Sequence, residues 1–168
     1  MHKKICVFGS YKSLEKKEKE NTICLGALFA ESGFTVVNGG FGGTMEDVAK
    51  GAKEAGGKTI GVTYYKYSDT ERKANKYIDE EIRTENIFER INVMLKQADG
   101  FIVLPGGTGT LLELAAILEH VNKGLMNPKP VIALGDCWRK VMGALSTCRD
   151  LVTFVDTPEE VLSILTAL

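Results

Sequence analysis

The stretch GFIVLPGGTGTLLELAAILEHVN, residues 100–122, places an apolar segment, a glycine-rich turn and a helical pattern in one continuous run. Residues 100–104 are apolar without alternation, which predicts a strand buried on both faces. The turn follows at 105–109, and apolar spacing predicts a helix over 110–122. A strand that passes through a glycine turn into a helix is the repeating unit of parallel α/β sheets.

The same unit recurs along the 168-residue chain. Further strands are predicted at 4–8, 34–37, 59–63, 130–134 and 151–155, with a possible strand at 77–83. Helices are predicted at 14–32, 45–55, 87–98 and 138–145, and the capping-box sequence Thr157-Pro158-Glu159-Glu160 opens a last helix that runs to 168. Residues 64–80 are polar and are expected to form a surface excursion. The pattern predicts one domain, 1–168, of the α/β class: a Rossmann-like, doubly wound, mainly parallel sheet with helices on both faces.

Composition excludes several functional classes. The formal net charge is −1, whereas a general binder of nucleic acid or anionic membranes is basic. No apolar run is long enough to span a membrane, and the N-terminal apolar segment is too short for a signal peptide. The four cysteines, at 6, 24, 137 and 148, lack C-x-x-C spacing, and only two histidines are present. We therefore expect buried reduced thiols, a cytoplasmic location, and neither metal nor cofactor.

Three glycine-rich loops each follow a predicted strand and precede a helix. In a doubly wound sheet they share the carboxyl edge, where ligands bind. Glycine lets backbone N–H groups approach a ligand, and a helix N-terminus favours an anion. The alternative is that glycine only permits tight turns. As phosphate- or substrate-binding candidates we take Gly9, Ser10, Gly39, Gly40, Gly43, Gly106, Gly107, Thr108, Gly109 and Thr110.

Glu113 is the only charged residue between Phe101 and Leu118. A helix that is apolar on nearly every side is expected to be buried, between the sheet and a second subunit. An unpaired carboxylate in such a place is costly, which favours a functional role beside the glycine loop. The alternative is structural, because Thr110-Leu111-Leu112-Glu113 also fits a capping box.

Arg90 borders the apolar stripe of the helix at 87–98, where its guanidinium can face a carboxylate, a phosphate or a flat base. The alternative is a helix-surface arginine paired with Glu85 or Glu89.

The sequence Pro105-Gly106-Gly107-Thr108-Gly109-Thr110-Leu111-Leu112-Glu113 resembles the PGGxGTxxE signature of the Lonely guy family, which is often labelled lysine decarboxylase-like. Arg90 and Met94 are similar to that family's R-K-x-x-M helix, and residues 39–45 to its GGxxGxM turn. Phe8-Gly9-Ser10 also matches after the first strand. The resemblance covers nearly the whole chain in the same order.

The resemblance implies a homodimeric phosphoribohydrolase with a Rossmann-like fold. Such an enzyme cleaves the N-glycosidic bond of a purine-type nucleoside 5′-monophosphate, giving free base and ribose 5-phosphate. The family's catalytic pair falls on Arg90 and Glu113, and Met94 joins the substrate-binding residues. A carboxylate that stabilises positive charge developing on the sugar agrees with this chemistry.

The sequence departs from the family around the base pocket, where Ile87-Phe88, Ile91 and Glu119-His120 replace the usual residues. A cytokinin-type nucleotide and a plain nucleotide such as AMP are therefore both open as substrates. The alternative function is a non-enzymatic carrier of a phosphate-bearing ligand, as in molybdenum-cofactor carriers of this fold and size. Retention of both Arg90 and Glu113 favours the enzyme.

Overall fold

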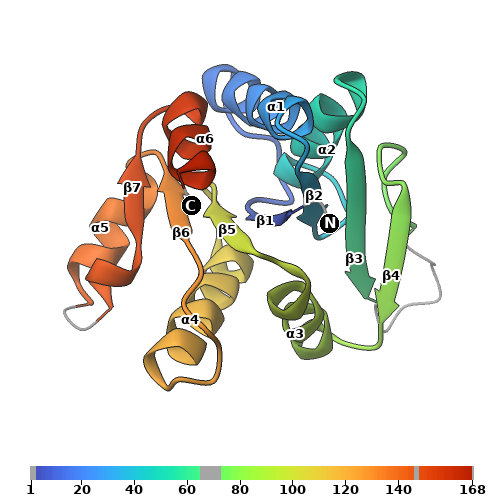
Figure 1. The fold of residues 1–168 in the computed structure, drawn as a ribbon. Coiled ribbons are helices and arrows are strands. Elements are labelled where there is room, and N and C mark those ends of the chain that lie inside the picture. Colours follow the sequence, from blue (N-terminus) through green and yellow to red (C-terminus); the bar gives the residue numbers. More distant parts are fainter. Residues whose placement is uncertain (1–2, 65–72, 146–147, 168) are drawn as a thin grey trace.

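The computed structural model describes residues 3–64, 73–145 and 148–167. Its strands and helices alternate along the chain, except that the described element after β3 is another strand, β4 (Figure 1). The strands are β1 (Lys4–Phe8), β2 (Thr35–Asn38), β3 (Lys58–Tyr64), β4 (Glu80–Thr84), β5 (Gly100–Val103), β6 (Val131–Leu134) and β7 (Thr153–Val155). The helices are α1 (Lys16–Glu31), α2 (Thr44–Glu54), α3 (Ile87–Gln97), α4 (Thr108–Asn122), α5 (Cys137–Gly143) and α6 (Pro158–Thr166), with a 3₁₀ turn at Arg149–Leu151.

The strands form one sheet in the order β4-β3-β2-β1-β5-β6-β7, and every neighbouring pair is parallel. Helices α1, α2 and α6 cover one face, and α3, α4 and α5 cover the other (Figure 1). The chain reverses its direction of winding between β1 and β5, so the loops after these neighbours leave toward opposite faces. The predicted Rossmann-like fold is confirmed.

Both faces of the central strands are apolar because both are covered by helices. In β1, Cys6 and Phe8 pack into the core beneath α3 and α4, whereas Ile5 and Val7 pack beneath α1 and α6. Phe8 stacks on Phe101 of the neighbouring β5, with ring centroids 6.0 Å apart. Phe8 lies opposite Val103 at the end of β5, so the loops after β1 and β5 leave the sheet at the same level along the strands.

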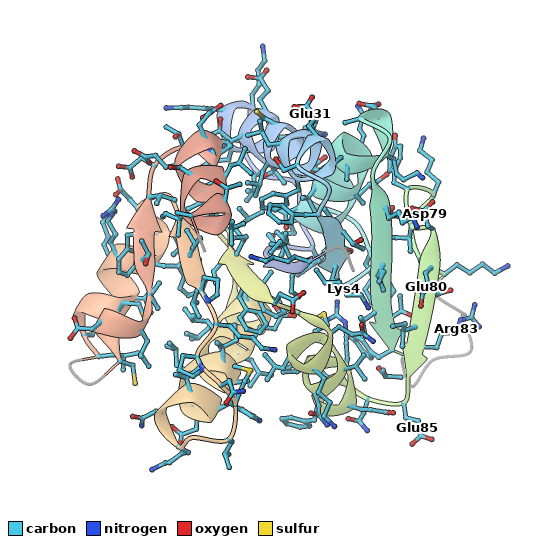
Figure 2. The ribbon with its side chains drawn as sticks, viewed as in Figure 1. Lys4, Glu31, Asp79, Glu80, Arg83 and Glu85 are labelled. Carbon is cyan, nitrogen blue, oxygen red and sulfur yellow. The ribbon has the colours of Figure 1, made fainter. Side chains whose placement is uncertain are left out.

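The strand expected at 77–83 begins later, at Glu80. Residues just before it hydrogen-bond to the start of β3 instead of continuing the strand: Thr59 Oγ1 donates to the Tyr77 carbonyl at 2.6 Å, and Thr59 N donates to Asp79 Oδ2 at 2.9 Å. Figure 2 labels Glu80 and Arg83 on this edge strand. Charged side chains on an edge strand oppose pairing with another sheet. Part of the expected excursion, 65–72, lies outside the described residues.

Two helix starts are informative about the sequence. The capping box of α6 is present: the Thr157 hydroxyl accepts from the Glu160 N–H, and Glu160 accepts from the Thr157 N–H. Helix α4, in contrast, begins at Thr108, two residues before the predicted start. The last strand is also shorter than predicted, because residues 149–151 form the 3₁₀ turn.

Candidate active site

The three glycine loops meet at the carboxyl edge of the sheet. The loop after β1 is tied to the turn after β2, because the Ser10 carbonyl accepts hydrogen bonds from Thr44 N at 2.9 Å and Thr44 Oγ1 at 3.0 Å. The third loop follows β5, whose end is joined to β1 by a 2.9 Å bond from Leu104 N to the Phe8 carbonyl. The predicted meeting of these loops at one edge is therefore what the structure shows.

Glu113 is not part of a helix cap. The N-cap of α4 is Gly107, so Thr110 lies inside the first turn and cannot act as the capping residue. Glu113 instead projects toward the sheet, with 7% of its surface exposed. Its Oε1 lies 3.6 Å from Nη1 of Arg90, and the two side chains are 10% and 8% exposed. The capping interpretation is thus wrong, and Glu113 forms a buried ion pair at the edge that carries the loops.

Arg90 is not a surface arginine. It lies in the first turn of α3, and its side chain passes beneath the ends of β2 and β3. Its Nε donates to the Val62 carbonyl at 2.7 Å, and its Nη2 donates to the Gly39 carbonyl at 3.0 Å. A Cβ on Gly39 would lie 1.6 Å from Nη2, so glycine is required there for the arginine to fit. The pairing with Glu85 or Glu89 is therefore wrong.

Burial dominates the electrostatics of this pair. It raises the pKa of Glu113 from its ordinary 4.5 to about 7, because desolvation of the carboxylate outweighs the attraction of Arg90. Burial also lowers the pKa of Arg90 below its ordinary range, against the opposing effect of Glu113. A carboxyl that titrates near neutral pH beside a ligand-binding edge is typical of a catalytic group.

The loop between β5 and α4 has open space beside two of its glycines, Gly107 and Gly109. In the described structure no side chain caps α4 at Gly107. The first N–H groups of this helix therefore donate no hydrogen bond to a capping side chain. A Cβ on Gly107 or Gly109 would meet nothing within 4 Å, whereas one on Gly106 would lie 2.1 Å from Thr110 Oγ1. Packing therefore explains Gly106 but not Gly107 or Gly109, which fits close approach of a ligand.

The other predicted site residues lie in the glycine loops or, for Met94, in the core. Gly39 and Gly40 are buried in the turn after β2, and Gly43, with φ +67°, forms the N-cap of α2. Gly9 packs against Thr44, where a Cβ would lie 2.3 Å from Thr44 Oγ1. Met94, expected among the substrate-binding residues, is fully buried in the core beneath α3 and has no surface open to a ligand.

A cavity of about 500 Å³ lies at the same edge of the sheet but is lined by neither Arg90 nor Glu113. Its lining includes Pro105, one lysine (Lys17) and four carboxylate residues (Glu15, Glu18, Asp136 and Asp156), so it is acidic on balance. Such a lining repels phosphate.

No group of three or more His, Cys, Asp or Glu residues in the described part of the chain could hold a metal ion. None of the described helices combines the length and apolarity needed to cross a membrane. Of the four cysteines, Cys6 is buried, Cys24 and Cys148 are half-buried and Cys137 is exposed. The expectation of four buried thiols is thus wrong, because three of them lie outside the sheet.

Sequence reasoning did not find two aromatic residues of the site. Phe41, in the glycine turn, and Tyr64, at the end of β3, lie on the guanidinium of Arg90, whose Cζ is 5.6 Å and 5.5 Å from their ring centroids. The position of Tyr64 at the end of a parallel strand is a signal that was available in the sequence.

Comparison with known proteins places the chain in a family. The SLOG cluster4 family matches residues 2–162. The cytokinin riboside 5′-monophosphate phosphoribohydrolase of Mycobacterium marinum is 38% identical over 115 residues, which are 68% of this chain and 60% of that protein. The protein of the same name from Mycobacterium tuberculosis is 43% identical over 96 residues, 54% of this chain and 48% of that one. The chain thus matches only about half to three fifths of these relatives.

Among solved structures, the molybdenum cofactor binding protein of Rippkaea orientalis superposes with a TM-score of 0.83 at 28% identity, covering 99% of this chain and 97% of the other. The family match and the two mycobacterial relatives confirm the resemblance to Lonely guy proteins that the PGGTGTLLE stretch indicated. With the family matched from residue 2 to residue 162, this chain belongs to the SLOG cluster4 family.

Proposed function

We propose that this protein hydrolyses the N-glycosidic bond of a purine-type nucleoside 5′-monophosphate, to free base and ribose 5-phosphate. The buried ion pair of Arg90 and Glu113 beneath the glycine loops is the observation that carries the proposal. The names of the two mycobacterial relatives support the same reaction class.

The 5′-phosphate is assigned to the start of α4. The uncapped N–H groups after Gly107 and the positive end of the helix dipole attract an anion, and the open space at Gly107 and Gly109 admits it. Binding the phosphate there fixes the ribose relative to Glu113, which lies further along the same helix.

Glu113 is assigned to the sugar. As the bond between C1′ and the base nitrogen breaks, positive charge develops on the ribose ring, and the carboxylate stabilises it. Water adds its hydroxyl to C1′, and the remaining proton balances the charge on the departing base. Arg90 keeps the carboxylate in place and favours its ionised form, although burial still raises its pKa.

A second copy of the chain is proposed to cover α4. Leu111 and Leu112 on this helix are 40% and 36% exposed, and Phe88, at the start of α3 on the same face of the sheet, is 71% exposed (Figure 1). Apolar side chains on neighbouring helices form a surface that association would bury. A homodimer is therefore proposed, with the nucleotide as its small-molecule ligand, and the cytoplasmic location stays a prediction.

The deciding experiment is incubation of the purified protein with nucleoside 5′-monophosphates, AMP and cytokinin-type nucleotides included, followed by detection of free base. Adenosine is the control that lacks the phosphate. We expect release of base from a nucleotide and a loss of several orders of magnitude in kcat/KM with the nucleoside. Equal kcat/KM for AMP and adenosine would overturn the assignment of the loop.

The second candidate is a carrier of a phosphate-bearing pterin. It is favoured by the superposition on the Rippkaea orientalis protein over nearly the full length of both chains. A carrier binds its ligand without cleaving it, so the same incubation separates the two functions. Tight binding of the pterin with no release of base from any nucleotide would favour the carrier.

A further inference from the structure

The orientation of the Arg90 guanidinium is restricted by its partners. Two of its nitrogens donate to the backbone carbonyls of Val62 and Gly39, at 2.7 Å and 3.0 Å. The third, Nη1, faces Glu113 at 3.6 Å. The planar fork of arginine is rigid, so fixing two nitrogens also fixes the direction of the third. Whatever fixes the plane of this guanidinium therefore also sets its approach to Glu113.

Two aromatic rings enclose the same guanidinium. Its Cζ lies 5.6 Å from the centroid of Phe41 and 5.5 Å from that of Tyr64. The two rings meet edge to face, with centroids 5.9 Å apart and planes at 79°. Guanidinium groups bind aromatic faces by cation–π attraction, which strengthens when water is excluded. The Arg90 side chain is only 8% exposed, so water is largely absent here.

Phe41 is itself held in place. The turn that carries it is bound by Asn75, whose Nδ2 donates to the Phe41 carbonyl at 2.8 Å and whose backbone N donates to the Gly40 carbonyl at 2.8 Å. Gly40, with φ +75°, supplies the left-handed conformation that the turn needs. Tyr64 is fixed at the other side by its place at the end of β3. The backbone at both ring-bearing residues is thus held in place.

We propose that Phe41 and Tyr64 are positioning residues for the hydrolysis, which act through Arg90 by fixing its guanidinium against Glu113 and keeping water from the pair. The proposal rests on the proposed function. Its consequence is that the rings affect the chemical step and leave substrate binding nearly unchanged. Rings that stacked on the base instead would affect KM, and would do so whether or not Arg90 was present.

The test uses Tyr64→Leu and Phe41→Leu, which remove a ring, and Tyr64→Phe, which keeps it. Each ring deletion is expected to lower kcat by on the order of tenfold to a hundredfold, with KM within about twofold. Tyr64→Phe is expected to restore kcat close to the wild-type value. The matched control is Phe154→Leu, because Phe154 lies under another arginine, Arg139, at 5.5 Å and far from the site; it is expected to keep kcat.

The same substitutions are then made in an Arg90→Lys background. If the rings act through Arg90, Tyr64→Leu causes little further loss of kcat there, so the effects are non-additive. Additive losses, or a loss confined to KM, would overturn the proposal. Should the wild type release no base from any nucleotide, the proposed function fails. In that case, urea unfolding of the Tyr64 and Arg90 single and double variants tests the contact between the ring and the guanidinium by itself. Non-additive losses of unfolding free energy support the contact, and additive losses overturn it.

Discussion

Arg90 and Glu113 approach within 3.6 Å although they belong to different helices, α3 and α4, and both side chains are about nine-tenths buried. Arg90 also donates to the carbonyls of Val62 in β3 and of Gly39 in the turn after β2, so the pair lies at the edge that carries the glycine loops. Removing two charges from water is costly, and a surface pair would give similar helix packing without that cost. The burial is better explained by the chemistry that it makes possible, because a desolvated carboxylate interacts more strongly with a developing cation.

The raised pKa of Glu113 predicts the pH dependence of turnover. The proposed reaction needs the carboxylate, and the pKa of this group in the free protein is about 7. We therefore expect kcat/KM to be constant above about pH 8 and to fall about tenfold per pH unit below pH 7. The measurement is a pH profile with the preferred nucleotide. A flat profile between pH 5 and 8 would contradict this role.

Protein stability gives an independent check of the same pKa. Between pH 4.5 and about 7 the carboxyl of Glu113 ionises in the unfolded chain but stays protonated in the folded one. The unfolded state then binds fewer protons, so stability falls as pH rises through this window, by about 3 kcal/mol in total. Urea unfolding should show that Glu113→Gln lacks this fall. Parallel stability curves for both proteins would place the pKa elsewhere.

Gly109 separates the needs of folding from those of ligand binding. It is exposed in the first turn of α4, and a Cβ there meets nothing within 4 Å. Alanine favours helix over glycine, so Gly109→Ala should raise stability by up to about 1 kcal/mol. The added methyl obstructs the phosphate, so kcat/KM should fall at least about tenfold.

The control for Gly109 is Gly143→Ala, at the end of α5, where a Cβ also meets nothing within 4 Å. Thermal melts and kinetics of both variants are the measurements. Unchanged kinetics in Gly109→Ala would show that the loop does not approach the ligand closely.

The exposed leucines of α4 predict the state of assembly. A homodimer that buries Leu111 and Leu112 should dissociate when a charge replaces one of them, because burying an unpaired charge is costly. Leu112→Glu is therefore expected to be monomeric by light scattering at micromolar concentration. Leu145→Glu, at a leucine that is 46% exposed beyond α5, is the control and should keep the wild-type mass. A monomeric wild type would contradict the dimer.

The sequence was sufficient for the parts of the fold that depend on local pattern. Continuous apolar strands and glycine turns predicted the parallel sheet and its ligand-binding edge, and the capping box located the start of α6. The start of α4 was misplaced, because Thr110-Leu111-Leu112-Glu113 is a valid capping box in isolation and only packing shows that the helix begins earlier. Local pattern does not report which way a side chain such as Glu113 points.

The surroundings of Arg90 depend on tertiary structure alone. Its partners come from the turn after β2, from β3 and from α4, so no spacing in the chain connects them. The resemblance to a family indicated that Arg90 and Glu113 belong together. The pair of rings formed by Phe41 and Tyr64 exists only because the fold brings the glycine turn and the end of β3 side by side.

The most direct test of the account is turnover by Glu113→Gln, measured beside a thermal melt and a nucleotide-binding titration. Glutamine keeps the size and polarity of the side chain but cannot supply negative charge to the developing cation. We predict a folded protein that binds the nucleotide within a few-fold of wild type and turns over on the order of a hundredfold or more slowly. Near-normal turnover by a folded Glu113→Gln protein would contradict it.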